Sequence, residues 1–460
     1  MTRYIRPARL LGVAAVLAMA TAGCNRDTLL EVTTPDIIDP SNVASADGAE
    51  GQRIGALGRF KLMTALDESS WFYGGMLVDE WKSADTFTQR NETDQRVVTV
   101  ENTLVTVAYR RIHQTRIQAV QAIKGLRTYQ PSQRGKIAEM WFLKAYAEMQ
   151  AASDFCNGQP FANLNIADAT ADVGSPVSSV DAFKLALASA DSGLASLGTP
   201  AASDSLGQRV LNGLSVLRGR ILLNLGQPAP AGAAVASVPK TFSWNLTWPG
   251  TQGKEDNGIW VLANSSRRYT VQDSADRQGG VIANAMPFLS AKDPRIPFTQ
   301  LTKFGFDGVT PHDAQLVFPA FNAPVPVANY VDAQVILAES QLAAGNAAWL
   351  QTLNALRTGP TNIGTVSVSG MPALVDPGSK SAQQLLLFRE RAFWTFGRGE
   401  RLGDLRRAIR VYGFTPAQIF PGQGSINPRT NSAYGPDLNL PVPQAETNSG
   451  LFSACTDRSA

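Results

Sequence analysis

Aromatic and acidic side chains stand close together in two stretches of this sequence, and their types suit the binding of sugars. The first stretch, residues 67–82, reads DESSWFYGGMLVDEWK. The second, residues 238–327, adds several more aromatics among many prolines and glycines. Flat aromatic faces can stack on sugar rings, while carboxylates can accept hydrogen bonds from sugar hydroxyls. Seven side chains are therefore candidate ligand contacts: Trp71, Tyr73, Trp81, Trp244, Trp248, Trp260 and Tyr269.

Two other interpretations of these stretches remain open. Each tryptophan could be a packing residue between helices, because large aromatics also fill cores. The acidic residues could instead hydrolyse a glycosidic bond, which requires two carboxylates about 5–10 Å apart across a cleft. Neighbouring positions along the chain do not establish such a pair. The acidic residues next to aromatics are Asp67, Glu68, Asp79 and Glu80.

Other catalytic machinery has little basis in the sequence. Only two histidines occur, His113 and His312, and neither an H-E-x-x-H nor a G-x-S-x-G motif is present. His113 lies beside an apolar helical stripe, which is typical of a packed, hydrogen-bonded residue. No cysteine has neighbours with metal-ligand spacing. The sequence therefore predicts a binding protein without catalytic residues, metal ion or cofactor.

The N-terminus has the pattern of a lipoprotein signal. Three arginines in the first nine residues precede an apolar run that is too short to span a bilayer, and TAGC follows it. Ala-Gly-Cys is the end of a lipobox, so we expect cleavage to leave Cys24 as a lipidated N-terminus. The alternative is an ordinary cleaved signal followed by an unmodified cysteine. We expect a signal peptide at 1–23 and a lipid-anchored tether at 24–50.

The charge balance argues against nucleic acid as a partner. The whole chain carries a formal charge of +3, but the signal holds three arginines and no acidic residue. Without it, 38 basic residues face 38 acidic ones. A neutral chain offers no basic surface for phosphates. With 44% hydrophobic and 17% charged residues the chain is globular, and the lipid is its only expected contact with a membrane.

Two cysteines remain after Cys24, namely Cys156 and Cys455. Outside the cytoplasm, an isolated pair favours a disulfide. Two separate buried thiols are the alternative.

Most of the remaining chain has helical periodicity. Apolar stripes at steps of three and four predict four helix pairs, at 103–154, 181–226, 328–358 and 381–412. The helix lengths resemble those of tetratricopeptide repeats, although the spacing is not the fixed 34 residues of that family. Between the second and third pairs, 238–327 predicts a loop-rich insertion with short strands, one of them near 258–263. Ser132 is the expected N-cap of the second helix.

The last helix pair is unusually rich in charge. Gly397 and Gly399 separate two amphipathic stripes, which predicts a hairpin packed against other helices. We favour a solvated, salt-bridged face for its charged residues over a charged ligand site. These residues are Arg389, Glu390, Arg391, Arg398, Glu400, Arg401, Asp404, Arg406 and Arg407.

Several segments, taken in order, resemble the SusD/RagB family of nutrient-binding outer-membrane lipoproteins. After the lipobox, residues 138–146 read AEMWFLKAY, similar to the family's AEAYFLRAY helix. Residues 330–339 read YVDAQVILAE, similar to its YAEAxLILAE helix. The hairpin contains FRER at 388–391 and RLGDLR at 401–406, similar to the pair RERxxE and RxxDLxR. Near the C-terminus, 440–443 reads LPVP, similar to the family's LPIP.

The resemblance implies a mainly α, tetratricopeptide-like fold of stacked helical hairpins, an α/α superhelix, in one domain over 51–460. It also implies a protein anchored in the outer membrane and facing the cell exterior. Such a protein binds an oligosaccharide or a peptide and passes it to a SusC-like TonB-dependent receptor. A surface glycoside hydrolase, or a structural transporter subunit without its own ligand, are the alternatives.

One segment departs from the family pattern. FWTFG at 393–397 stands where ELAFEG is common, and it lacks the acidic residue. Family ligand contacts lie in variable loops, so the resemblance assigns none of them here.

Overall fold

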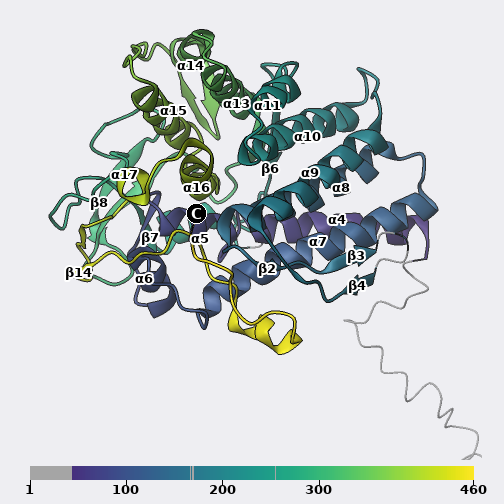
Figure 1. Ribbon diagram of the computed structural model, residues 1–460, viewed down its shortest axis with the longest axis horizontal. Helices are drawn as coiled ribbons and strands as arrows, with labels where there is room; N and C mark the ends of the chain where they lie inside the picture. Colours follow the sequence, from purple (N-terminus) through teal and green to yellow (C-terminus); the bar gives the residue numbers. More distant parts are fainter. Residues whose placement is uncertain (1–43, 166, 168–169, 254, 460) are drawn as a thin grey trace, which may run out of the picture.

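A computed structural model of the chain describes residues 44–165, 167, 170–253 and 255–459 (Figure 1). The expected signal, Cys24 and most of the expected tether lie outside these residues. The first described helix begins inside the end of that tether, at Ala46, where the Ser45 hydroxyl accepts a hydrogen bond from the Gly48 amide at 3.0 Å. Among the described residues, no helix has the length and apolarity that crossing a membrane requires.

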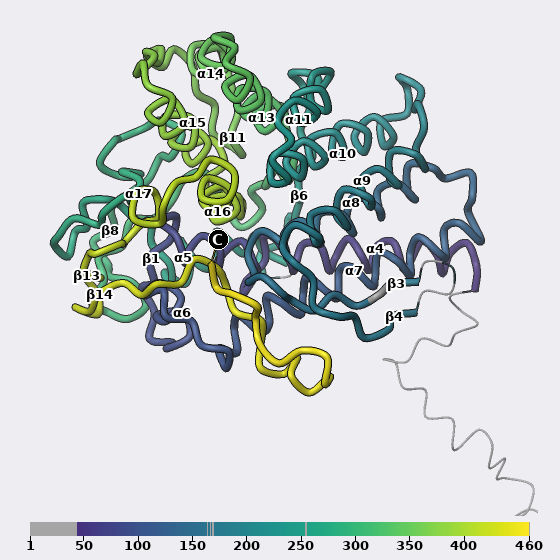
Figure 2. Tube along the Cα trace, in the orientation of Figure 1, coloured from purple at the N-terminus to yellow at the C-terminus, as the bar shows by residue number. Residues whose placement is uncertain are grey.

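A scaffold of packed helices forms the framework of the molecule. Each of its helices packs against its neighbour in sequence, from α4 and α7 through to α13 and α14, as Figure 2 shows along the chain trace. This arrangement confirms the predicted mainly α fold of stacked hairpins, including the four predicted helix pairs. The scaffold helices are α4 (Ala46–Thr64), α7 (Thr103–Tyr129), α8 (Arg134–Asp154), α9 (Ser179–Leu197), α10 (Ser205–Asn224), α11 (Pro228–Val235), α13 (Tyr330–Ala343) and α14 (Ala348–Thr358).

The apolar stripes read from the sequence face the interior of this scaffold. In α7, Ile112, Ala119 and Ile123 have no exposed surface, because each lies on the face that packs against α4 and α8. The Asn102 side chain caps the helix by accepting from the Val105 amide at 3.0 Å. The expected cap at Ser132 is wrong, since Gln133 precedes α8 without a side-chain cap bond.

Seven short antiparallel strand pairs lie around and between the helices in the described part of the chain (Figure 1). Strands of the predicted insertion take part in three of these pairs. The pairs are β1 (Trp81–Ser83) with β7 (Tyr269–Val271), β6 (Ser243–Leu246) with β10 (Val325–Asn329), β8 (Phe298–Phe304) with β9 (Pro311–Gln315), β2 (Gln159–Pro160) with β5 (Pro176–Val177), β3 (Asn163–Asn165) with β4 (Thr170–Asp172), β11 (Thr361–Ile363) with β12 (Val366–Val368), and β13 (Ile426–Asn427) with β14 (Ser432–Ala433).

The strand expected near 258–263 is wrong, because this segment is helical. It forms α12 (Gly258–Trp260) and the π-helical turn η1 (Val261–Ser265). The side chain of Asn257 accepts from the amides of Ile259 and Trp260 at 2.9 and 3.3 Å, and this cap starts the helical turn.

The charged hairpin α15–α16 lies across the middle of the molecule, where α16 packs against α5, α8 and α10. Gly397 and Gly399 in its turn have φ of 72° and 66°. A Cβ on Gly399 would lie 2.1 Å from Cδ1 of Trp71, so only glycine fits there. The remaining helices are α5 (Ser70–Leu77), α6 (Thr88–Gln95), α15 (Lys380–Trp394), α16 (Arg401–Tyr412), α17 (Pro416–Ile419) and the 3₁₀ helix η2 (Gln444–Ser449).

The solvated face expected on this hairpin is wrong. Of the ten charged residues at 381–412, eight are buried, and Arg389 and Arg410 are partly exposed. Their partners come from distant elements, such as Glu339 and Asp332 of α13. Arg407 donates to both carboxylate oxygens of Glu339 at 2.8 and 2.9 Å, and Arg398 donates to Asp332 at 3.1 Å. Within the hairpin, Arg391 binds Asp404 at 2.8 and 3.0 Å. The charges form an internal network that fixes the hairpin.

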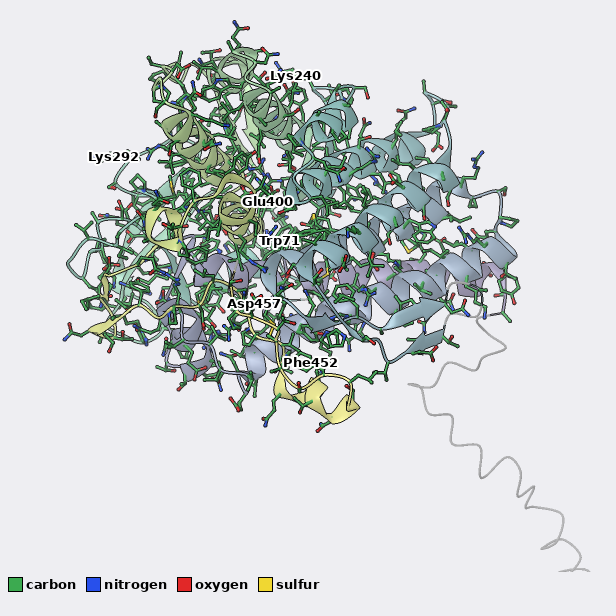
Figure 3. All side chains as sticks on the ribbon, in the orientation of Figure 1. Trp71, Lys240, Lys292, Glu400, Phe452 and Asp457 are labelled. Carbon is green, nitrogen blue, oxygen red and sulfur yellow. A yellow bond between two sulfur atoms is a disulfide. The ribbon has the colours of Figure 1, made fainter. Side chains whose placement is uncertain are left out.

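A disulfide ties the C-terminal tail to the scaffold. It joins Cys156, two residues beyond α8, to Cys455, with their Cα atoms 5.9 Å apart. Beside it, the Thr456 amide donates to the Asn157 carbonyl at 2.8 Å. The tail thereby lies along the scaffold, where Figure 3 labels its residues Phe452 and Asp457.

Candidate functional site

The structure places most of the predicted ligand-contact aromatics in the core. Trp71, Tyr73, Trp81 and Tyr269 are at most 1% exposed. Figure 3 shows Trp71 in the middle of the molecule, near Glu400. Trp81 packs against Phe396 with the ring centroids 4.9 Å apart. These four residues serve the packing of α5 and the hairpin turn, so their faces are closed to a ligand.

The two tryptophans of the early insertion are packing residues as well. Trp244 stacks on Phe142 of α8, with centroids 4.2 Å apart, and Trp248 is 8% exposed. Both side chains help to attach the insertion to the helical scaffold. Among the seven candidates, Trp260 alone is partly exposed, so it is the one that can still offer a ring face to a ligand.

The fold separates the four acidic residues next to the first aromatics: Asp79 and Glu80 lie in the interior, and Asp67 and Glu68 do not. Asp79 is fully buried and receives two hydrogen bonds from Arg401, at 2.9 and 3.0 Å. Glu80 is also buried and accepts from the Gly397 amide at 2.9 Å. Burial raises the pKa of Glu80 to about 8, and the nearby Asp79 adds to the rise. These two carboxyls hold the hairpin turn and face no cleft.

The other two acids lie outside that interior. Glu68 accepts hydrogen bonds from Tyr73 and Arg90. The Asp67 side chain is 59% exposed, and its nearest cation is Arg111 at 3.7 Å. Asp67 is thus the most exposed member of the predicted cluster, since the Glu68 side chain is 15% exposed.

A groove of about 580 Å³ lies where the two predicted ligand stretches meet. Asp67 contributes from the first stretch, and Glu255, Asp256 and Val261 from the second. Residues of α4, including Arg59, form the opposite side. Trp260 precedes the lining residue Val261 in the same helical turn, and its partly exposed ring lies edge-on to Phe321 with the centroids 6.2 Å apart.

Glycines of α4 make room for this groove. A Cβ on Gly58 would meet no atom within 4 Å, and one on Gly55 would reach only Gln118 at 3.6 Å. Gly55 and Gly58 both line the groove, and they are spaced to lie on one face of the helix. Larger residues would project into the space, so the groove depends on the glycines.

The two stretches are fastened to each other beneath the groove. The Gly258 amide donates to the Ala65 carbonyl at 2.9 Å, and a Cβ on Gly258 would lie 2.4 Å from the carbonyl carbon of Leu66. Within the second stretch, Asn257 donates from its amide to the Phe321 carbonyl at 2.7 Å and from its side chain to the Ala323 carbonyl at 2.8 Å. This backbone fixing makes the groove a preformed site.

The rim of the groove carries charges of both signs. Glu255 pairs with Lys61 at 2.9 Å, and the Glu255 side chain keeps 37% exposure. Arg59 has one long hydrogen bond, to Gln114 at 3.4 Å. Three acidic residues and one arginine line the groove, so hydrogen-bond acceptors outnumber charged donors there. Such a rim suits a ligand that offers many hydroxyl or amide N–H donors.

The groups required for other chemistry lie elsewhere. Both histidines are in the interior, where burial lowers the pKa of His113 to about 3 and that of His312 to about 4. Within the described residues, no group of three or more His, Cys, Asp or Glu side chains could hold a metal ion.

Solved structures share this fold at low sequence identity. A SusD superfamily protein from Bacteroides thetaiotaomicron has a TM-score of 0.60 and 14% identity, covering 90% of this chain and 98% of its own. NanU of B. fragilis has a TM-score of 0.61 and 12% identity, covering 92% and 100%. A SusD-like carbohydrate binding protein from Bacteroides fragilis has a TM-score of 0.59 and 14% identity, covering 88% and 98%.

The comparisons of sequence, in contrast, found no match. No protein-family model matches the chain, and no curated protein matches it. The structural likeness extends over nearly the whole chain, so this protein has the SusD-like fold that its motifs predicted.

Proposed function

We propose that this protein binds a nutrient, an oligosaccharide in the first instance, in the groove between α4 and the 253–261 segment. The observation that carries the proposal is the meeting of Asp67, Glu255 and Asp256 around a preformed groove. The partly exposed Trp260 directly precedes the lining residue Val261 and is the aromatic candidate that we assign to this ligand. A solved structure with the same fold is described as a SusD-like carbohydrate binding protein, which supports the ligand class.

The proposal extends to the cellular role that the resemblance implies. The signal at 1–23 is removed, Cys24 is acylated, and a short tether leads to a single domain on the outer surface of the outer membrane. From there, the protein delivers its ligand to a SusC-like TonB-dependent receptor. Mass spectrometry of the mature N-terminus tests the anchor, since an unmodified Cys24 would contradict it. Co-purification with such a receptor encoded beside this chain tests the delivery.

Binding without turnover is the test of the proposed activity. The purified protein is screened against a glycan array, and the best ligand is titrated by calorimetry while the ligand is checked for cleavage products. Trp260→Ala should weaken binding by about 1–3 kcal/mol, the usual loss when a stacking ring is removed. Product formation would point to a hydrolase instead.

A matched control distinguishes the groove from exposed aromatic surface in general. Phe306 is 47% exposed and lies outside the groove lining. Phe306→Ala should leave the affinity unchanged. Equal losses in both variants, or no loss in either, would exclude Trp260 as the contact.

A further inference from the structure

A second cavity, of about 240 Å³, is built on the strands of the insertion and shares no lining residue with the groove. Lys82 of β1 lies opposite Thr270 of β7, and Gln300 of β8 lies opposite Asp313 of β9. The Thr270 hydroxyl accepts from the Asp313 amide at 2.7 Å and so links the two strand pairs. All four side chains line the cavity, which we call the strand pocket.

Two ion pairs fix the loop that closes one side of the strand pocket. Lys82 donates to Asp276 at 2.7 Å, and both side chains are 5% exposed. Arg277 pairs with Asp313 at 2.8 Å. The Arg277 side chain keeps 38% exposure, so its remaining N–H donors can reach a ligand in the cavity.

The other wall of the strand pocket is apolar. Val271, Leu289 and the partly exposed Phe298 line it. Lys292 also lines the cavity and is exposed, and Figure 3 shows it at the outside of the molecule. The strand pocket thus has one polar side and one apolar side, and it opens to solvent.

The charges of the strand pocket select the chemistry of its ligand. Its charged lining is balanced, with Lys82, Arg277 and Lys292 against Asp273, Asp276 and Asp313. A carboxylate or phosphate ligand would need surplus cations, and an amine would need surplus anions. A ligand with hydroxyl groups needs neither, because each hydroxyl both donates and accepts.

The three carboxylates of the strand pocket are all engaged, which disfavours the ammonium group of an amino acid or other zwitterion. Asp276 and Asp313 hold the two ion pairs, and Asp273 accepts from the Leu289 and Ser290 amides at 3.1 and 3.3 Å. Paired groups can still bind hydroxyls, as Arg277 gives one of its five N–H donors to Asp313. The Gln300 side chain, exposed opposite Asp313, adds one more donor and acceptor.

We propose that the strand pocket binds a single neutral sugar unit, with the ring against Phe298 and the hydroxyls toward Gln300, Asp313 and Arg277. This site is separate from the groove and does not depend on it. Its volume limits it to one ring, whereas the groove is more than twice as large.

Calorimetric titration with neutral monosaccharides tests this proposal, using glucose, galactose and mannose, with glucuronate and glycine as charged probes. A neutral sugar should bind, and Gln300→Ala and Phe298→Ala should each weaken it about tenfold or more. Both substitutions leave the two ion pairs intact. Thr299→Ala is the matched control, because Thr299 is exposed on the same strand and does not line the cavity.

The outcomes separate the two sites. Trp260→Ala should not change monosaccharide binding, and Gln300→Ala should retain a groove-bound oligosaccharide. The proposal is overturned if no neutral monosaccharide binds, if only glucuronate or glycine binds, or if Gln300→Ala and Phe298→Ala bind the sugar as tightly as Thr299→Ala. Unchanged melting temperatures for the three variants show that a loss is local.

Discussion

The hairpin α15–α16 and the groove beside α4 both gather charged residues, but they use them in opposite ways. In the hairpin, buried arginines are met by carboxylates from other elements, as Arg407 is by Glu339. In the groove, Asp67 and Glu255 keep much of their side chains in water. Charges that satisfy each other in the interior hold a fold together, and charges left at the rim of a cavity can meet a ligand. The comparison predicts that changes in the hairpin affect stability, whereas changes in the groove affect binding.

The largest effect is expected from breaking the buried network. Arg407→Ala leaves the Glu339 carboxylate without its bidentate partner in the interior. Loss of one member of a buried pair costs about 3–5 kcal/mol of unfolding free energy, measured by urea unfolding. Arg389→Ala is the control on the same hairpin, because Arg389 is partly exposed and contacts the Phe393 ring rather than a carboxylate. A loss below about 1 kcal/mol for Arg407→Ala, a value typical of surface pairs, would contradict the structural role.

Glycine substitutions sharpen the same contrast. Gly399→Ala forces a Cβ against Trp71 at a left-handed backbone position, and we expect a loss of about 2–4 kcal/mol. Gly58→Ala meets open space within a helix, so it should stabilise the protein by about 0.5–1 kcal/mol. Gly58→Leu should fill the groove and weaken oligosaccharide binding. If Gly58→Leu binds as well as wild type, the ligand does not occupy the groove.

The buried carboxyl of Glu80 should make the unfolding free energy of the protein depend on pH. Its folded pKa of about 8 lies above the usual value of 4.5, so between these values the folded state holds a proton that the unfolded state releases. The contribution of Glu80 to stability is therefore fully present below about pH 4.5 and is lost as the pH rises through 8. The loss is about 1.4 kcal/mol per pH unit across that window.

Comparing the Glu80→Gln variant with the wild-type protein measures this effect. The variant cannot release the proton, so its unfolding free energy should fall less steeply than that of wild type between pH 5 and 8. Urea unfolding at several pH values gives the two slopes. Parallel curves for the two proteins would show that Glu80 does not titrate in this range.

The smallest effect on stability is expected at the groove rim. Asp67→Ala should change the unfolding free energy by no more than about 0.5 kcal/mol, as exposed sites usually do. The same variant should bind the oligosaccharide more weakly, because a hydroxyl loses its acceptor. Calorimetry on Asp67→Ala and Asp191→Ala, an exposed acid of α9, separates a specific loss from a general change in surface charge.

Local patterns in the sequence predicted the four helix pairs, but not the short scaffold helix α11. Helix stripes such as Ile112, Ala119 and Ile123 depend only on spacing along one helix, and the fold follows from packing those stripes. The motifs of the hairpin also carried the family resemblance. The helical turn after 257 was missed, although Asn257 is a common capping residue and could have indicated it.

Local sequence patterns could not predict which charged and aromatic residues are buried, because their partners lie far away along the chain. The partners of Arg401 and Arg398 are Asp79 and Asp332, which are 322 and 66 residues away. Burial of Trp71 depends on the glycine at 399. The glycines of α4 are the one local feature of the sequence that indicates the groove. The backbone of a helix interior does not require glycine, so another reason must account for them. Their spacing at 51, 55 and 58 marks one helix face.

Hydrogen–deuterium exchange with and without the oligosaccharide selected by the array tests the division between the two regions directly. Both regions are observed in one experiment on the unmodified protein. We predict that the ligand slows exchange at 55–67 and 253–261 and leaves exchange at 388–407 unchanged. Slower exchange at 388–407 with no change on either side of the groove would contradict it.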